Sequence, residues 1–405
     1  MPSVPATLAR LNVDRRVLRT TALCVVLAFA FASVRWLGDV WHWPLLDLSV
    51  YRRGAGELIH GRSLYDSASH FPHPDLPFTY PPFAAALFVP AYLVGPVLAG
   101  IGQSLLTLGC YLLVTLTCGR RLGIAWPVLL PLAGLGFALE PVQRTFWLGQ
   151  VNLLLAALVV ADCFLVPARW RGVLTGVAAG IKIIPGVYVI YFVLRREWWS
   201  VARAVVGFAA TVGVSAIASP HDATHFWTKL FWDPNHVGQQ SYISNQSLYG
   251  QLVRFTRDLH PATAVYAPIA LAALGLAAYA AHRQLRIGDN VAALTCVAFG
   301  GLLTSPISWS HHWVWFVPAV LVLIASGRRR AAALIALVPA LAPEWWTPST
   351  QPPYTYIAEF HHHWWQTWLC VSYAVAGLAF LALMCQRRPA RTSSEDTRSA
   401  AELSA

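Results

Sequence analysis

The sequence predicts an all-α, polytopic membrane protein with about ten to twelve transmembrane helices. Of its 405 residues, 57% are hydrophobic and only 12% are charged, and the mean hydropathy is +0.52. A soluble domain carries roughly 25% charged residues. Apolar runs of about 17–23 residues recur along the chain, and about 20 helical residues cross a bilayer. Composition therefore predicts one integral membrane domain over residues 1–386, because no polar segment is long enough to build a second domain.

The apolar runs and the polar segments between them predict the topology. The expected membrane passes are 20–38, 82–100, 102–118, 124–140, 150–166, 172–194, 201–218, 262–281, 290–304, 307–326, 331–343 and 366–385. Short connections carry paired arginines, such as Arg120/Arg121, whereas the long ones are 39–81, 219–261 and 344–365. Cytoplasmic loops are enriched in Lys and Arg. The three long segments are therefore expected on the outer side.

Strict alternation of twelve passes conflicts with this rule. It would place the arginines at 120–121 and 169–171 on the outer side. The conflict disappears if 82–118 makes one net crossing and 172–194 returns to its own side. Pro185 and the glycines of TGVAAGIKIIPG favour a broken or re-entrant helix there. Some of the ten to twelve helices are therefore expected to be discontinuous.

The two ends of the chain are polar. Arg10, Arg15, Arg16 and Arg19 precede the first apolar run, which lacks a small-residue cleavage site. This arrangement predicts a retained signal anchor with a cytoplasmic N-terminus. The composition of the tail over 387–405 predicts a disordered cytoplasmic segment.

The net charge of +11 comes almost entirely from arginine, since Lys182 and Lys229 are the only lysines. The arginines form short groups between apolar runs, which indicates membrane topology and argues against nucleic-acid binding. All seven cysteines lie in or at the ends of apolar runs, where they are typical small buried hydrophobes. Neither a disulfide framework nor a metal site is predicted.

Asp47 is the first residue that suggests chemistry. In HWPLLDLSVYRRGAG it lies among apolar residues, directly before Tyr51, Arg52 and Arg53. Desolvation raises the pKa of a carboxyl group and makes it a better base. Glu57 belongs instead to GAGELIHGRSLYD, which is expected to form a short amphipathic helix on the membrane. Asp47 is thus either a solvated loop residue or the centre of a site.

Basic side chains that interrupt apolar runs form a second group of candidates. Lys182 lies in GVAAGIKIIPGVYVI, three residues before a proline, and an intramembrane lysine indicates a functional site or a side chain that snorkels to the interface. His311 and His312 open a helix after Pro306, where a phosphate could bind or a proton could move. The alternative for both histidines is an interfacial location without a partner.

Neutral polar residues at helix starts and aromatic outer loops form a third group. Such side chains are usually helix caps, but amides and hydroxyls can also line a sugar pocket. The aromatic rings of the outer loops, for example in HFWTKLFWDPNH, indicate either an interfacial belt or a surface on which sugars stack. The polar candidates are Gln150, Asn152, Asn245, Gln246 and Ser247.

Taken together, several segments resemble one known family. They are DLSVYRRGAGELIHGRSLYD, FTYPPFAAALFVP, WLGQVNLLLAALVVAD, GVAAGIKIIPGVYVIYFVLRREWW, NQSLYGQLVR and SPISWSHHWVW, in that order over about residues 40–320. In this series the chain resembles the polyprenol-phosphate-sugar-dependent membrane glycosyltransferases of family 87, which have the GT-C architecture. The resemblance implies a polyprenyl-phosphate-mannose donor, or in one branch an arabinofuranose donor, and a mannosylated phosphatidylinositol acceptor. It also implies a multi-pass protein of the inner (plasma) membrane whose active site faces the periplasm.

The resemblance further implies roles for individual residues. Asp47 matches the catalytic acid of the first outer loop, followed by the family-like Tyr51. Lys182 and His311 match positions expected to hold the donor phosphate, with His311 counted among the catalytic residues. Tyr51, Arg52, Arg53, Gln150, Asn152, Asn245, Gln246, Ser247 and His312 are the further substrate-binding candidates.

The expected chemistry agrees with these residue types. An attacking sugar hydroxyl must lose a proton, so one carboxylate serves as general base. A lipid phosphate leaving group needs cations and not an acid. No metal or other cofactor is predicted, and a monomer is expected. An arabinofuranosyltransferase and a lipid or glycolipid transporter remain the alternatives, although a transporter would gather its polar residues at the bilayer midplane.

Overall fold

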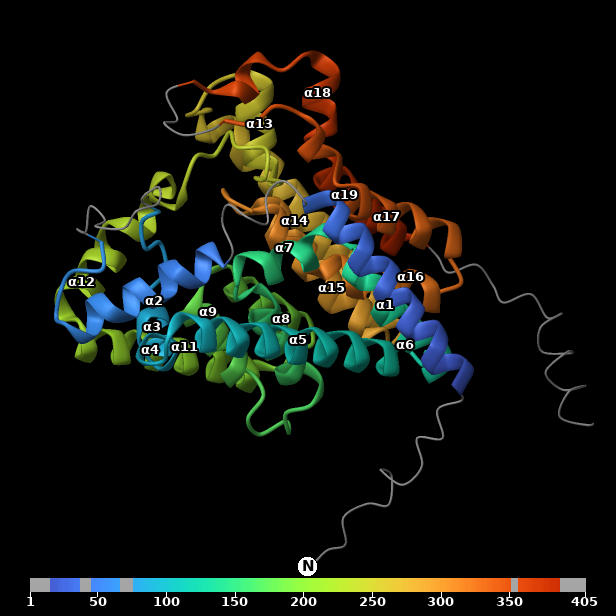
Figure 1. Cartoon of the computed structure of the whole chain (residues 1–405), viewed down its shortest axis with the longest axis horizontal. Coiled ribbons are helices and arrows are strands. Elements are labelled where there is room, and N and C mark those ends of the chain that lie inside the picture. The colour runs from blue at the N-terminus through green and yellow to red at the C-terminus, as the bar shows by residue number, and fades with distance from the viewer. Residues whose placement is uncertain (1–14, 37–44, 66–75, 351–355, 387–405) are drawn as a thin grey trace, which may run out of the picture.

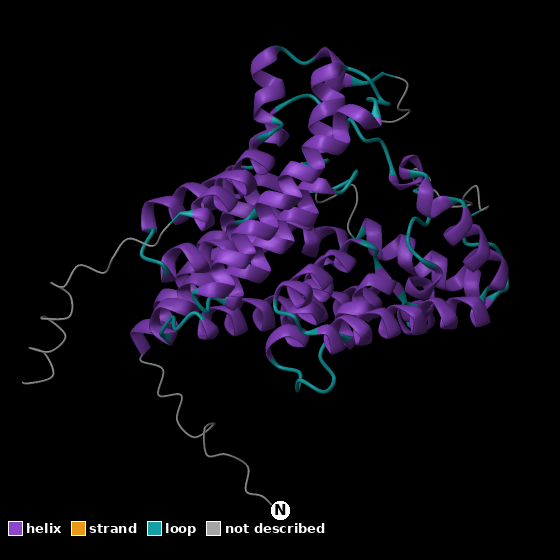
Figure 2. Cartoon of the chain, turned by 180° about the vertical axis from the view of Figure 1, so that it is seen from behind, coloured by secondary structure: helices purple, strands orange, loops and turns teal. Residues whose placement is uncertain are grey.

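The structure is a computed structural model that describes residues 15–36, 45–65, 76–350 and 356–386. Over these ranges the chain is helical and forms no strand (Figure 2). The only strand-like pairing in the described part is an isolated antiparallel bridge between Asn245 and Trp309. The predicted all-α class is confirmed. The predictions for the segments 1–14 and 387–405 fall outside the described residues.

Three described helices are long and apolar enough to cross a membrane: α5 (Pro96–Arg121), α11 (Trp198–Ala218) and α14 (Thr263–Arg286). The prediction of a separate pass over 82–100 is wrong. That region forms two short helices, α3 (Pro82–Leu87) and α4 (Val89–Leu93), before α5 begins. The helices α3, α4 and α5 each have a proline within their first two residues, where the missing N–H and fixed φ suit a helix start but not a helix interior.

Other predicted passes are interrupted. α7 (Glu140–Leu148) and α8 (Asn152–Phe164) meet at an angle of 114° across residues 149–151. The predicted break near Pro185 is confirmed, because α9 (Val173–Ile181) ends at Lys182 and is followed by the 3-10 helix η3 (Ile184–Tyr188) and by α10 (Val189–Leu194). A third break separates α15 (Asn290–Thr304) from η6 (Ser310–Trp315) and α16 (Phe316–Ala325).

Shorter apolar helices complete the described membrane region. They include α6 (Trp126–Leu135), which continues into η2 (Gly136–Ala138), and α19 (Ser372–Cys385). With the three long helices, the bent pair and the remaining short helices, they agree with a polytopic membrane protein. The number of ten to twelve passes stays a prediction.

Close helix packing depends on small residues. Three glycines face α11, with Gly172 directly before α9 and Gly176 and Gly180 within it, and a Cβ at Gly176 would lie 2.1 Å from the Ala204 carbonyl oxygen. Small residues at a spacing of four let two helices approach within a membrane, where burial of apolar surface does not drive association. Other helices that pack side by side are α14 with α15, α5 with α8, and α16 with α17 (Arg329–Leu341). Along α6 lies α1 (Arg15–Trp36) (Figure 1).

The three long polar segments fold into short helices at the ends of the longer ones. The first forms α2 (Leu46–Ile59), which begins eight residues before the predicted amphipathic stretch and so contains Asp47. The second forms α12 (Pro220–Thr228), η4 (Leu230–Trp232), η5 (Pro234–Val237) and α13 (Leu248–Thr256). The last forms η7 (Pro343–Trp346), η8 (Ala358–His361) and α18 (Trp364–Leu369). In Figure 1, α13 and α18 protrude together at the top, while α2 and α12 gather at the left.

Candidate active site

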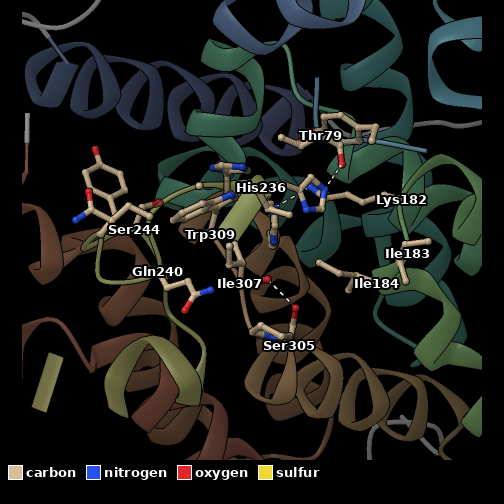
Figure 3. Close-up of a pocket in the computed structure, with 18 of the residues that line it drawn as sticks. Thr79, Lys182, Ile183, Ile184, His236, Gln240, Ser244, Ser305, Ile307 and Trp309 are labelled. Carbon is tan, nitrogen blue, oxygen red and sulfur yellow. Dashed lines mark hydrogen bonds between the residues drawn. The ribbon is translucent and has the colours of Figure 1, made fainter. Parts of the chain in front are cut away.

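A cavity of about 1120 Å³ lies where these short helices meet the helix breaks. Its walls combine apolar side chains with a few charged and polar groups, as is usual for ligand sites (Figure 3). The chemistry-bearing side chains on the wall include Asp47, Tyr80, Arg144, Gln150, Lys182, Asp233, His236, Gln240, Tyr242, Ser244, His260, Trp309, His311 and His312.

Asp47 lies in the first turn of α2 and faces the cavity. Burial raises the pKa of its carboxyl group to about 6, although the hydrogen bond to Gln150 and the charges of Lys182 and Arg144 act in the opposite direction. At neutral pH, Asp47 is therefore a carboxylate, and a more basic one than an aspartate in water.

The start of α2 is fixed to the break between α7 and α8. The Leu45 amide donates to the Trp147 carbonyl oxygen at 2.8 Å. Gly149 has φ +68°, and a Cβ there would lie 2.8 Å from the Leu48 Cβ, so this turn needs glycine. The adjoining Gln150 thereby comes beside Asp47.

Gln150 belongs to a buried network behind Asp47. The Tyr51 hydroxyl donates to the Gln150 Oε1 at 2.8 Å and lies 3.0 Å from the Tyr80 hydroxyl, to which the Gln150 Nε2 donates at 3.3 Å. Tyr51 is fully buried and does not line the cavity, whereas Gln150 and Tyr80 do. Tyr51 thus supports the wall from behind.

Lys182 occupies the break between α9 and η3 and projects into the cavity. Its Nζ lies 2.8 Å from the His312 Nε2 and donates to the Asn152 Oδ1 at 3.3 Å. The Asn152 Nδ2 in turn donates to the His311 carbonyl oxygen at 3.0 Å. Asn152, which is not on the cavity wall, ties the lysine to the histidine pair.

His311 differs from the other polar groups of the site. Its ring is buried on the cavity wall, and neither ring nitrogen has a hydrogen-bond partner among the described residues. The ring contacts that of His312 edge-on, with 4.8 Å between centroids. Because buried polar atoms are normally paired, both nitrogens are available to bond a ligand in the cavity.

Arg144, on α7, is a cation of the site that the sequence did not single out. Its guanidinium lies 4.1 Å from the centre of the Trp345 ring and lines the same cavity as Lys182. The available signal was topological: Arg144 and Lys182 both lie outside the arginine groups that mark cytoplasmic loops. The cavity wall therefore carries the Asp47 carboxylate and at least two basic side chains, those of Lys182 and Arg144.

Comparisons with known proteins identify the family of the chain. The pattern of glycosyltransferase family 87 matches residues 78–306. The chain is 33% identical to the polyprenol-phosphate-mannose-dependent alpha-(1-2)-phosphatidylinositol mannoside mannosyltransferase of Mycobacterium tuberculosis, over 85% of this chain and 87% of the relative. The chain belongs to glycosyltransferase family 87.

Two further relatives come from Mycolicibacterium smegmatis. The protein with the same name as the M. tuberculosis relative is 35% identical, over 82% of this chain and 83% of its own. A polyprenol-phosphate-mannose-dependent alpha-(1-2)-phosphatidylinositol pentamannoside mannosyltransferase is 34% identical, over 94% of this chain and 93% of the relative. No solved structure matches the chain significantly. The family predicted from the sequence is thus confirmed, and the chain is a glycosyltransferase.

The structure does not bring Arg52 and Arg53, two of the predicted substrate-binding residues, into the cavity of this glycosyltransferase. Arg52 donates from Nε to the Ala91 carbonyl oxygen at 2.9 Å and from Nη2 to that of Val94 at 3.2 Å. Arg53 donates to the Leu76 carbonyl oxygen. Neither guanidinium lines the cavity, so both serve to hold α2 against its surroundings.

Asn245, Gln246 and Ser247 also lie off the cavity wall, and their side chains bond to nearby backbone. Ser247 caps α13, with its Oγ accepting from the Gly250 amide at 3.0 Å. The Gln246 Nε2 donates to the Ile243 carbonyl oxygen at 2.7 Å. The geometry gives these three residues a role in building the site, where the sequence predicted contact with substrate.

Glu140 is a second residue that the sequence analysis missed. It is fully buried, and its Oε1 accepts hydrogen bonds from the Ser310 hydroxyl at 2.7 Å and the Trp345 indole N–H at 3.1 Å. Its Oε2 accepts from the Tyr373 hydroxyl at 2.8 Å. Burial and the nearby Glu140 side chain raise the pKa of Glu344 well above its usual value.

Proposed function

We propose that this glycosyltransferase moves mannose from polyprenyl phosphate to a mannosylated phosphatidylinositol and forms an α-(1→2) linkage. The names of three relatives, each at least 33% identical over at least 82% of the chain, support this substrate pair. The single observation that carries the mechanism is that the Asp47 carboxylate and the cations Lys182 and Arg144 face one cavity.

Asp47 acts as general base. It accepts the proton of the attacking acceptor hydroxyl while that oxygen bonds to the anomeric carbon of the donor. The bond between the anomeric carbon and the phosphate oxygen breaks, and its electron pair leaves with the polyprenyl phosphate. A single displacement inverts the anomeric centre, so a β-linked donor gives an α-linked product. The raised pKa of Asp47 suits the task, because a base is most effective when its pKa approaches the working pH.

The polyprenyl phosphate leaves as an anion next to Lys182 and Arg144. Positive charge fixed where negative charge develops lowers the barrier without reorganisation during the reaction. The unpaired ring nitrogens of His311 offer further hydrogen bonds to a phosphate oxygen. Lys182 holds His312 and, through Asn152, the backbone of His311, so these groups respond to the phosphate as one unit.

The proposal includes the setting of the reaction. The chain is a single catalytic domain over residues 1–386, sits in the inner (plasma) membrane as a monomer, and opens its active site to the periplasm. The placement of paired arginines in short connections and of α2, α12 and η7 in the long segments supports this orientation.

Transfer by the purified protein tests the function. Polyprenyl-phosphate-mannose and polyprenyl-phosphate-arabinose are offered separately, each with a phosphatidylinositol mannoside acceptor, and products are identified by mass spectrometry. We expect one hexose to be added from the mannose donor only, and cleavage by an α-(1→2)-specific mannosidase. Transfer of a pentose without transfer of a hexose would contradict the proposal.

A further inference from the structure

Two separate segments form one rigid wall of the cavity. Residues 238–247 meet residues 305–310 at one antiparallel bridge, between Asn245 and Trp309, and the Gln246 amide donates to the Ser308 carbonyl oxygen at 2.8 Å. This is the only strand-like pairing in the part of the chain that the structure describes. We call these two segments the paired wall.

Buried side chains fix the paired wall from behind. Asn245 is fully buried, and its Oδ1 accepts from the Ser308 amide at 2.9 Å while its Nδ2 donates to the Pro306 carbonyl oxygen at 3.1 Å. Arg254 is also buried and donates to the carbonyl oxygens of Tyr242 and Asn245, at 3.0 and 2.7 Å. These buried hydrogen bonds hold the two segments in place.

The paired wall presents uncharged groups to the cavity. The half-exposed rings of Trp309 and Tyr242 line it, together with the side chains of Gln240 and Ser244. Gly238 has φ +130°, and a Cβ there would lie 3.1 Å from the Trp309 ring, so glycine lets the backbone pass close to the indole. Neither segment of the wall contains Asp, Glu, Lys or Arg.

The cationic groups lie elsewhere on the cavity surface. In Figure 3, Gln240, Ser244 and Trp309 lie on the left, and Lys182 with Ile183 and Ile184 lies on the right. The donor sugar is bonded directly to a phosphate, so it must stay near the cations. An acceptor glycan is neutral and extends over several sugars, so it needs a surface without charge.

We propose that the paired wall is the acceptor-glycan subsite and binds a neutral hexopyranoside of the acceptor. The apolar face of the sugar ring lies on Trp309, and a sugar hydroxyl donates to the Gln240 amide oxygen. A flat ring beside a few neutral donors and acceptors is the combination that suits a sugar, which is apolar on one face and polar at its edge. This inference rests on the proposed function for the identity of the glycan.

Kinetics of Trp309→Leu test the subsite. We expect the KM for the phosphatidylinositol mannoside to rise about tenfold, which corresponds to about 1.4 kcal/mol, while the KM for polyprenyl-phosphate-mannose stays within twofold. Gln240→Leu should act in the same direction by roughly threefold, in line with the loss of one neutral hydrogen bond. The matched control is Trp346→Leu, because Trp346 is 59% exposed in the same outer region and does not line the cavity.

Binding separates this inference from the proposed function. The soluble disaccharide α-(1→6)-mannobiose is titrated calorimetrically into the full-length protein in nanodiscs, without donor. Binding to the wild type and to Trp346→Leu, but not to Trp309→Leu, supports the subsite even if no transfer is detected. Equal binding by Trp309→Leu overturns it. A rise in donor KM that matches the rise in acceptor KM also overturns it, because the wall would then belong to the donor sugar.

Discussion

The straight helices and the broken helices of this glycosyltransferase have different roles. Among the described residues, none on the straight helices α5, α11 and α14 lines the cavity. The three breaks, by contrast, supply Gln150, Lys182 and the stretch from Ser305 to His312. The straight helices expose apolar side chains such as Ile217, which is 86% exposed, as a lipid-facing surface does.

The difference has a physical cause. Hydrocarbon cannot bond to a free N–H or C=O group, so irregular backbone at membrane depth is tolerated only inside the protein or at a cavity. A helix break therefore has to lie at a polar cavity or inside the protein. A polar side chain at the break can then point into that cavity. The comparison predicts that polar groups at the breaks matter for transfer, and that similar groups on straight helices matter for stability.

The largest effect is expected from Asp47→Asn, which removes the proposed base held at the first break. Transfer should fall by roughly 10²–10⁴-fold, the usual contribution of general base catalysis. The folded protein should become more stable by about 3 kcal/mol at neutral pH, because the folded state raises the Asp47 pKa from 3.8 to about 6 and so disfavours the charged form. Single-turnover rates and thermal unfolding in detergent measure the two effects.

Asp162→Asn is the matched control for Asp47→Asn. Asp162 is a buried aspartate of α8, and its carboxylate accepts from the amides of Gly172 and Thr175 at the start of α9, away from the break. Its substitution should lower stability by about 1 kcal/mol, as loss of a helix cap does, and leave the single-turnover rate within a few fold. Near-normal transfer by Asp47→Asn would show that Asp47 is not the base.

The next largest effect is expected from replacing a basic residue at a helix break, and it is compared with the same replacement on a straight helix. Lys182→Met should reduce kcat/KM for the donor by roughly 10²-fold, in line with removal of one charge that stabilises a transition state. Arg203, on α11, donates to the carbonyl oxygens of Arg171 and Ala168 at 2.8 Å. Arg203→Met should therefore change kcat/KM by less than threefold. Equal losses in the two variants would remove the distinction between broken and straight helices.

A smaller effect is expected from pH. Because the Asp47 pKa is raised to about 6, the carboxylate is present above that pH and is lost below it. The value of kcat/KM should be level near pH 7 and fall about tenfold per pH unit below pH 6, as measured with a fixed donor and acceptor. If the acid limb lies near pH 4 instead, Asp47 is an ordinary solvated carboxylate and the cavity does not desolvate it.

Much of this site could be predicted from residues that are chemically out of place. Asp47, Lys182 and His311 interrupt apolar sequence, and Pro185 marks a break, so their contribution to one cavity follows from the cost of burying polar groups. Arg144 was not predicted as a site residue, because arginines in a membrane protein also mark its cytoplasmic loops.

Other errors came from side-chain direction. At 100° per residue, Arg52 and Arg53 lie about 140° and 120° around α2 from Asp47, so the helix start at Leu46 turns them away from the cavity. That start could not be placed without the contact between Leu45 and Trp147, which are far apart in the sequence. For Asn245, the sequence does not reveal whether an amide faces a ligand or the neighbouring backbone.

The smallest effect, and the one that most sharpens the comparison, is expected from Glu140→Gln. Glu140 holds Ser310, which precedes His311, and Trp345, on whose ring Arg144 lies. Glutamine has one acceptor oxygen where glutamate has two, so its amide cannot accept from Ser310 and Trp345 on one side and from Tyr373 on the other. An amide whose nitrogen faces Ser310 and Trp345 loses both of these bonds, and the phosphate-binding groups loosen. The KM for the donor should rise about fivefold, equivalent to about 1 kcal/mol, with the acceptor KM unchanged.

Tyr373→Phe decides how Glu140 acts. Tyr373 donates to the same carboxylate but comes from α19, which does not line the cavity. If Glu140 positions the donor site, Tyr373→Phe should lower the unfolding temperature and leave the donor KM within twofold. Glu140→Gln should then raise the donor KM. If both variants raise the donor KM equally, Glu140 stabilises the bundle as a whole. Glu140 lies one turn before Arg144 on α7, so the bonds that fix Glu140 also fix the turn that carries the Arg144 guanidinium. This position favours a role for Glu140 in the donor site.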